Sequence, residues 1–194
     1  MTTANKLTVT RLCLVPVFFI WYFIDRLFPV APLLYAVVLV LIYGVGELTD
    51  LLDGIVARRS GTVTDLGKVM DPFSDVMSHL TYFTCFLVSG LMPVWAYVVI
   101  LWREFSQSFL RMLLMGRGKP MAANIFGKAK TCLYAAVSIC GIAVHLCRML
   151  GKTGPWMFTT MTVLGGLAAV ASALSFYIYI YRVVKAGTLR DMTR

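Results

Sequence analysis

The chain has 194 residues, of which 59% are apolar and only 14% charged, and eighteen basic against nine acidic side chains leave a net charge of +9. Soluble domains are about 45–50% apolar and about 25% charged, and the mean hydropathy of +0.80 is far from such a domain. This composition argues against a soluble enzyme, a disordered tail and a disulfide-stapled secreted domain. Because the excess charge is basic and the chain is apolar, anionic lipid is a better partner than nucleic acid.

Apolar runs follow one another along the chain, separated by short polar or Pro/Gly breaks that are typical helix-stop and turn signals. A transmembrane helix needs roughly 20 apolar residues, so the pattern predicts an all-α membrane protein with six transmembrane helices. We expect these helices to form a single domain over residues 1–194. The predicted spans are 8–28, 32–57, 69–90, 93–115, 125–148 and 156–184.

The basic residues predict the orientation of these spans, because cytoplasmic loops carry an excess of Lys and Arg. With the N-terminus in the cytoplasm, fifteen of the eighteen basic residues lie at cytoplasmic span ends; the other three are Arg26, Arg148 and Lys152. We therefore expect a multi-pass membrane protein with both termini in the cytoplasm.

Acidic residues are concentrated where the second predicted span ends and the third begins. Six of the nine fall within 29 positions: Glu47, Asp50, Asp53, Asp65, Asp71 and Asp75. Asp50 and Asp53 are three residues apart and Asp71 and Asp75 are four apart, so each pair shares one face of a helix. The turn between the two spans brings these faces together, and four carboxylates are then predicted to converge near the cytoplasmic boundary.

A solvated run of charge is the alternative for this cluster, but the acids alternate with apolar residues such as Leu51, Val69 and Phe73. A charged side chain at mid-membrane costs about 2.5–3.5 kcal/mol, and carboxylates in close contact repel one another. The cluster therefore needs cations. Arg58 and Arg59 could pair with one or two of the acids, but oxygen ligands without a His or Cys cluster favour a hard divalent cation.

The acids belong to a longer pattern of eight residues at set spacings within 26 positions: Asp50, Asp53, Gly54, Ala57, Arg58, Gly67, Asp71 and Asp75. This pattern resembles the signature of the CDP-alcohol phosphotransferases at every fixed position. The resemblance implies six transmembrane helices, commonly a homodimer, and an active site open to the cytoplasm. It also implies transfer of a phosphate-linked group from a CDP-alcohol, with release of CMP.

The same resemblance assigns roles to the residues of the signature. Asp50, Asp53 and Asp71 would hold two divalent ions, Mg²⁺ or Mn²⁺, with Asp75 as a further ligand, as the general base, or as both. The residues implied to bind the CDP moiety are Asp53, Gly54, Ala57, Arg58 and Gly67. Small residues also let helices pack closely in membranes, so the glycines alone do not decide between packing and ligand binding.

Further segments are similar to those of bacterial phosphatidylglycerophosphate synthases. They are the opening Asn5–Arg11, Thr62–Pro72, Arg103-Glu104 with Ser108–Arg111, and Ala122–Thr131. The resemblance implies CDP-diacylglycerol and glycerol 3-phosphate as substrates. Since the phosphate of the acceptor needs cationic partners, it points to four basic residues as its binding site: Arg103, Arg111, Lys128 and Lys130. The alternative is that these residues only set the topology.

Three departures from that pattern leave the acceptor open. Val76 replaces the usual Lys, His79 stands where small or apolar residues are more usual, and Tyr134 stands where Gln is common. Other acceptors or donors therefore remain alternatives: inositol phosphate, serine, or CDP-choline or CDP-ethanolamine with diacylglycerol. A small cation transporter is a more remote alternative, but it predicts acids at mid-depth on several spans, whereas here they cluster at two helix ends.

Overall fold

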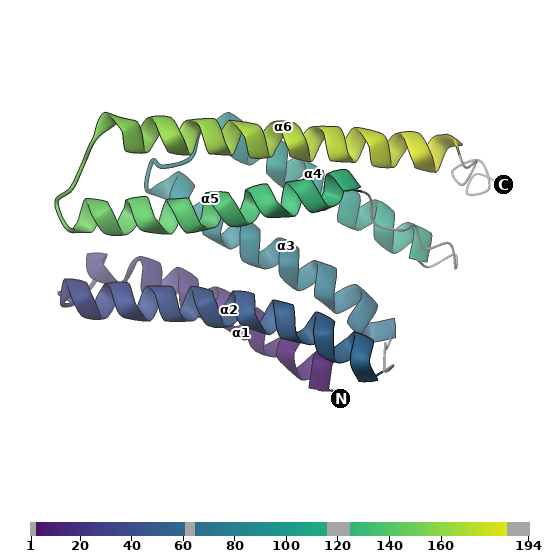
Figure 1. Ribbon diagram of the computed structural model, residues 1–194, viewed down its shortest axis with the longest axis horizontal. Helices are drawn as coiled ribbons and strands as arrows, with labels where there is room; N and C mark the ends of the chain where they lie inside the picture. The colour runs from purple at the N-terminus through teal and green to yellow at the C-terminus, as the bar shows by residue number, and fades with distance from the viewer. Residues whose placement is uncertain (1–2, 61–64, 116–124, 186–194) are drawn as a thin grey trace. The chain divides into compact units, whose positions relative to one another are not determined.

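The computed structural model describes residues 3–60, 65–115 and 125–185, except the side chains of residues 3, 4, 53–60, 65, 66, 68, 115, 125, 126 and 128. Across these residues the chain is helical, without a strand. The elements are α1 (Thr3–Tyr22), the short 3₁₀ helix η1 (Ile24–Arg26), α2 (Pro32–Ser60), α3 (Asp65–Val88), α4 (Val94–Met115), α5 (Ile125–Met149) and α6 (Pro155–Lys185) (Figure 1).

The predicted all-α class is confirmed, and each predicted span corresponds to one α-helix. Two of the predicted breaks contain glycines with positive φ, Gly90 at 69° and Gly151 at 71°. Glycine adopts this left-handed conformation without steric cost, which lets the chain reverse there. The predicted break at residues 58–68 is shorter than expected, since α2 continues to Ser60 and α3 begins at Asp65. The acidic signature therefore lies mostly on helix ends.

Four of the described helices are long and apolar enough to cross a membrane. The candidate spans are Asn5–Arg26, Pro32–Leu52, Ala129–Met149 and Pro155–Lys185. The remaining two helices carry charges along their length: α3 contains Asp71 and Asp75, and α4 contains Arg103, Glu104 and Arg111. The two helices that are least typical of membrane spans thus carry Asp71, Asp75, Arg103 and Arg111, four of the residues that the sequence marks as functional.

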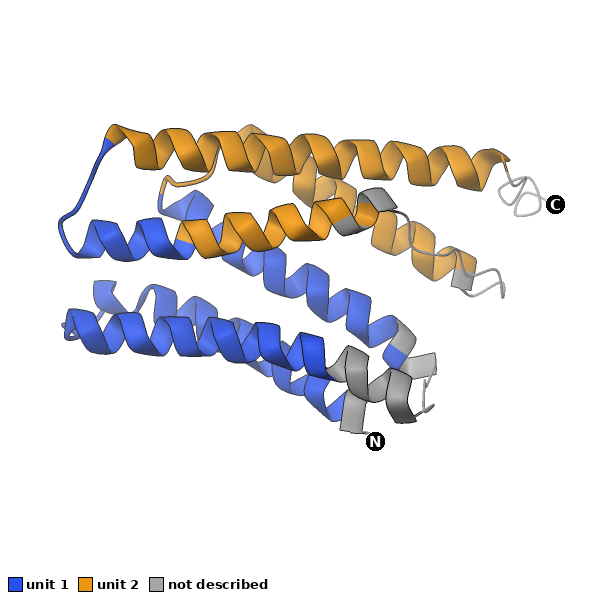
Figure 2. Ribbon diagram, viewed as in Figure 1, with its two compact units in different colours: residues 1–89, 142–154 blue, residues 90–141, 155–194 orange. Residues whose placement is uncertain are grey.

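The chain forms two compact units (Figure 2): unit 1 comprises residues 1–89 and 142–154, and unit 2 comprises residues 90–141 and 155–194. In unit 1, α1 packs against both α2 and α3. Aromatic side chains fill the contact, with the buried ring of Phe18 edge-on to Tyr82 at 4.5 Å between centroids. This packing brings the beginnings of α1 and α3 close to the end of α2. The charge pattern predicts that these three helix ends face the cytoplasm.

In unit 2, α4 packs against α6, and small residues of α6 form part of the contact. A side chain at Gly166 would bring its Cβ within 3.2 Å of the ring of Trp95, and one at Gly165 would meet Pro93 at 3.6 Å. Small residues allow this close approach of helices. The result is that α6 lies near enough to α4 for polar side chains of the two helices to share hydrogen bonds.

Candidate active site

Two carboxylates of the acidic signature meet at one cation in unit 1. Asp50 near the end of α2 and Asp71 in the first part of α3 both form salt bridges with the guanidinium of Arg11, which projects from α1. The contact from Arg11 Nη2 to Asp71 Oδ1 is a hydrogen bond of 2.8 Å. Arg11 is 3% exposed. The convergence that the sequence predicts is therefore present for Asp50 and Asp71.

Asp75 lies one turn beyond Asp71 on α3, and it contacts a histidine. Nε2 of His79 is 3.2 Å from Oδ1 of Asp75, four residues earlier on the same helix. The side chain of His79 is 7% exposed and that of Asp75 is 34% exposed. The histidine is thus held inside the helix packing, whereas the carboxylate of Asp75 remains accessible to a small molecule.

The donor set of this region fits a hard divalent cation. Asp50 and Asp71 come from different helices, yet both approach a single positively charged group, and all their ligand atoms are oxygens. Mg²⁺ and Mn²⁺ prefer such ligands. Among the described side chains no three His, Cys, Asp or Glu residues form a metal-binding group. The third predicted ligand, Asp53, belongs to α2, and its side chain lies outside the described residues.

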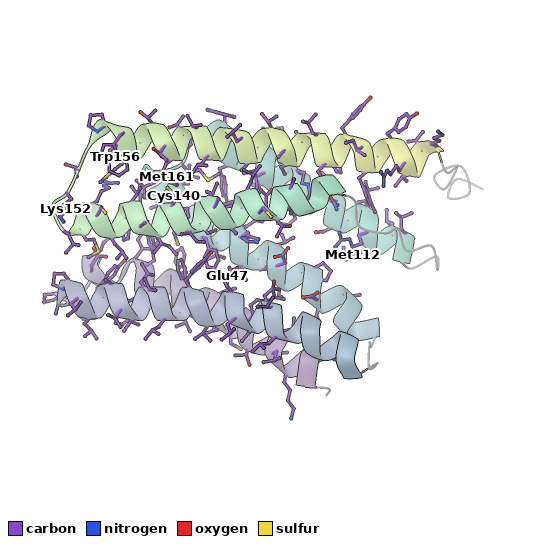
Figure 3. The ribbon with its side chains drawn as sticks, viewed as in Figure 1. Glu47, Met112, Cys140, Lys152, Trp156 and Met161 are labelled. Carbon is purple, nitrogen blue, oxygen red and sulfur yellow. The ribbon has the colours of Figure 1, made fainter. Side chains whose placement is uncertain are left out.

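The residues predicted to bind the CDP moiety flank these acids in the sequence. Gly67 lies half-buried in the first turn of α3. The side chains of Asp53, Ala57 and Arg58, and the surroundings of Gly54, lie outside the described residues. Glu47 is half-buried on α2, three residues before Asp50, and is labelled in Figure 3. The nucleotide site therefore stays a prediction from the signature.

Two of the four predicted acceptor-binding residues meet in a second charged cluster, in unit 2. Arg103 Nη1 and Lys130 Nζ donate hydrogen bonds of 2.7 and 2.8 Å to the same oxygen of Glu104. Arg103, Glu104 and Lys130 are 5%, 3% and 6% exposed. Because all three charges are buried, loss of Glu104 would leave two buried charges without their partner, which is strongly destabilising.

Polar residues of α5 and α6 complete the cluster. The hydroxyl of Tyr134 donates to Glu104 Oε1 at 2.9 Å and lies 2.9 Å from the hydroxyl of Ser172. Arg103 Nη2 donates to Ser175 Oγ at 3.3 Å. Arg111 lies half-buried two turns farther along α4, and the side chain of Lys128 is outside the described residues.

Sequence reasoning assigned no role to several residues of these clusters. Arg11 and Glu104 occur in segments quoted for the resemblance, but nothing in their spacing marks them as partners of distant charges. An acidic residue between basic ones in an apolar helix is a usable signal for Glu104, because a buried carboxylate needs a counter-charge. The two serines carry no such signal, because hydroxyls also bond to the backbone of their own helix.

Comparison with known proteins identifies the family of the chain. The sequence model of the CDP-alcohol phosphatidyltransferase family matches residues 1–174. The chain belongs to this family. The match covers the complete eight-residue signature and the charged residues of both clusters of this CDP-alcohol phosphatidyltransferase, so the resemblance predicted from the sequence is confirmed at the level of the family.

Curated relatives of this phosphatidyltransferase carry more specific names. A CDP-diacylglycerol–glycerol-3-phosphate 3-phosphatidyltransferase of Treponema pallidum is 33% identical over 93% of this chain and 88% of its own length. The protein of the same name from Bacillus subtilis is 35% identical over 66% of this chain and 69% of its own length. A probable phosphatidylglycerophosphate synthase of Mycobacterium tuberculosis is 34% identical over 68% of this chain and 61% of its own length.

Proposed function

We propose that this enzyme transfers the phosphatidyl group of CDP-diacylglycerol to glycerol 3-phosphate, giving phosphatidylglycerol phosphate and CMP. The observation that carries the proposal is the sequence similarity to two relatives named for this reaction, at 33% and 35% identity. The two charged clusters are consistent with it, because one collects carboxylates for a diphosphate with its cations and the other collects basic groups for an anionic acceptor.

The proposed reaction uses Asp75 to accept a proton and the other acids of the signature to hold cations. The acceptor hydroxyl attacks the phosphorus that carries the diacylglycerol, the bond from that phosphorus to the CMP oxygen breaks, and Asp75 accepts the hydroxyl proton. Asp75 suits this role because its carboxylate is partly accessible and one of its oxygens is in contact with His79. Asp50, Asp53 and Asp71, with Asp75 as a further ligand, would hold divalent cations, which would supply positive charge to neutralise the diphosphate and the departing CMP.

Arg103, Arg111, Lys128 and Lys130 are proposed to attract and hold the phosphate of the acceptor. Arg103 and Lys130 together with Glu104 leave one positive charge in a buried cluster. Basic side chains form strong charge-assisted hydrogen bonds with phosphate oxygens. A phosphate monoester would use such donors, whereas a neutral acceptor would not need them.

A headgroup panel tests the reaction. Purified protein is given labelled CDP-diacylglycerol, Mg²⁺ and one alcohol at a time: glycerol 3-phosphate, glycerol, inositol phosphate or serine. We expect CMP release and a phosphatidyl product with glycerol 3-phosphate, and no release when EDTA replaces Mg²⁺. Release with another alcohol but not with glycerol 3-phosphate would refute the acceptor, and full activity in chelator would refute the dependence on a divalent cation.

We further propose six spans in one domain, both termini and the active site in the cytoplasm, and assembly as a homodimer. In a variant without the five native cysteines, single cysteines at Ser60 and Thr193 should react with an impermeant thiol reagent only from the cytoplasmic side, and one at Thr153 only from outside. The reverse pattern, or different sides for Ser60 and Thr193, contradicts the orientation. A monomeric mass in mild detergent contradicts the dimer.

A further inference from the structure

Lys130 is fixed on two sides by neighbouring groups. Its ammonium nitrogen donates to Glu104 Oε1 at 2.8 Å, and the same nitrogen lies 4.4 Å from the centre of the Tyr134 ring. The second contact has the geometry of a cation–π interaction. A lysine side chain has many accessible rotamers, and two contacts on its ammonium group restrict that group to few positions.

Tyr134 contacts both Lys130 and the carboxylate partner of Lys130, Glu104. Its hydroxyl bonds to the same Glu104 oxygen that accepts from Lys130, and it reaches Ser172 on α6. Tyr134 and Ser172 are fully buried, at 0% exposure. The chain of contacts from Ser172 through Tyr134 to Glu104 thus joins α6, α5 and α4 and ends at the ammonium group of Lys130.

We propose that Tyr134, anchored by Ser172, is a positioning residue that sets affinity for the phosphate of the acceptor by holding Glu104 and Lys130 in place. This inference rests on the proposed acceptor role of Lys130. The ring supports the ammonium from one side and the hydroxyl fixes its carboxylate partner, so the cation is preorganised before the acceptor arrives. Tyr134 itself is not proposed to touch a substrate.

Removal of the hydroxyl separates this role from packing. Tyr134→Phe keeps the ring but removes the hydrogen bonds to Glu104 and Ser172. We expect the KM for glycerol 3-phosphate to rise at least about threefold, the low end of coupling within one hydrogen-bond network. The kcat and the KM for CDP-diacylglycerol should stay within about twofold. Ser172→Ala should produce the same change with a smaller amplitude, and Tyr177→Phe, the same change at an exposed tyrosine of α6, should produce none.

A double-mutant cycle shows whether the effect passes through Lys130. In the Lys130→Ala background, Tyr134→Phe should leave the acceptor KM unchanged within about 1.5-fold, because residues that act through a shared partner are not additive. A full threefold rise in that background, an equal rise in both KM values, or no rise with either Tyr134→Phe or Ser172→Ala in the wild type would overturn the proposal. Should Tyr134→Phe fail to fold, Ser172→Ala is used in the same cycle.

The same measurements keep this inference separate from the proposed function. If the wild type releases no CMP with glycerol 3-phosphate, the reaction itself is wrong. If it does, but Lys130→Ala leaves the acceptor KM unchanged, the acceptor role of Lys130 is wrong. If Lys130→Ala raises that KM and Tyr134→Phe does not, only the positioning role of Tyr134 is wrong.

Discussion

Arg11 in unit 1 and Glu104 in unit 2 are the shared partners in two charged clusters of opposite composition. Arg11 is one cation between two carboxylates, Asp50 and Asp71. Glu104 is one carboxylate between two cations, Arg103 and Lys130. Among these groups alone, the first set has one more negative than positive charge and the second one more positive than negative charge. This opposite composition is consistent with the proposed ligands, which are cations for the first cluster and an anion for the second.

The clusters also differ in exposure, which suits these two tasks. The side chains of Asp50 and Asp71 are 45% and 55% exposed, whereas that of Glu104 is 4% exposed. Exposed carboxylates can exchange one cation for another at little cost, since water solvates the carboxylates after the first cation leaves and before the second one binds. Buried charges must keep their partners, because an unpaired buried charge is strongly destabilising. We therefore expect the acidic cluster to take up ions more readily and the basic cluster to keep a fixed geometry.

The largest expected effect is on the acidic cluster. Asp71→Asn removes one charge from the proposed cation site and should lower kcat at least about 10³-fold, because stabilisation of the charge that develops in the transition state accounts for much of the rate of such reactions. The rate of CMP release at saturating substrates measures this. Asp25→Asn, the same change at an exposed residue of η1, serves as the control and should be near wild type. An active Asp71→Asn enzyme would mean that the acidic cluster only balances Arg11.

Stability should respond more strongly in the basic cluster. Glu104→Gln leaves two buried cations without their carboxylate and should cost about 3–5 kcal/mol of unfolding free energy, or roughly 6–20 °C in Tm for a chain of this size. Thermal unfolding in detergent measures the change. The double variant Glu104→Gln with Lys130→Gln should recover part of the loss, because the surplus charge falls. Asp50→Asn, at an exposed carboxylate, should change Tm by far less.

Local patterns predicted much of this structure from the sequence. Apolar runs and Pro/Gly breaks placed the six described α-helices. The spacing of Asp50, Asp53, Asp71 and Asp75 predicted that these carboxylates would converge, and the described contacts bring Asp50 and Asp71 together. These features depend on periodicity within one or two helices. The partner of Asp50 and Asp71 could not be predicted, because Arg11 is 60 residues away from Asp71 in sequence and only the packing of α1 brings it there.

The basic cluster shows more clearly that contacts between residues far apart in the sequence cannot be predicted from local patterns. Arg103 and Lys130 are two of the four basic residues that the sequence marked for an anion, yet both are buried and paired with Glu104. Positive charge near a predicted cytoplasmic boundary fits topology, ligand binding and internal pairing equally well, and only tertiary contacts separate these roles. Tyr134 stood out as a departure from the family pattern, but its hydrogen bonds depend on α6, which contributes Ser172.

A smaller effect tests whether the basic cluster also serves the acceptor. A hydrogen bond to a charged group contributes about 1.5–3 kcal/mol, which corresponds to roughly 10- to 100-fold in affinity. Lys130→Ala and Arg111→Ala should each raise the KM for glycerol 3-phosphate at least about tenfold and change that for CDP-diacylglycerol much less. Arg182→Ala, on α6 near its end, is the matched control. If both variants alter only Tm, the two residues serve topology and packing.

The smallest expected effect concerns the histidine of unit 1 that contacts Asp75. His79→Ala removes the 3.2 Å contact to Oδ1 and should lower kcat about threefold to tenfold, the range for one hydrogen bond of about 0.5–1.5 kcal/mol. Neither KM should change, because the carboxylate is needed as oxygen attacks rather than when substrates bind. His79→Gln, which can still donate to Asp75, should restore most of the rate.

The other histidine of unit 1 provides the comparison for this last effect. His145 stacks on Tyr22 with ring centroids 4.1 Å apart, and its Nε2 lies 2.9 Å from the hydroxyl of Tyr35. These contacts join α5 to α1 and α2 and involve no residue of the signature. His145→Gln should therefore lower Tm without changing kcat at a temperature where the protein is folded. Equal effects of the two variants on kcat and Tm would show that His79 stabilises the fold and does not position Asp75.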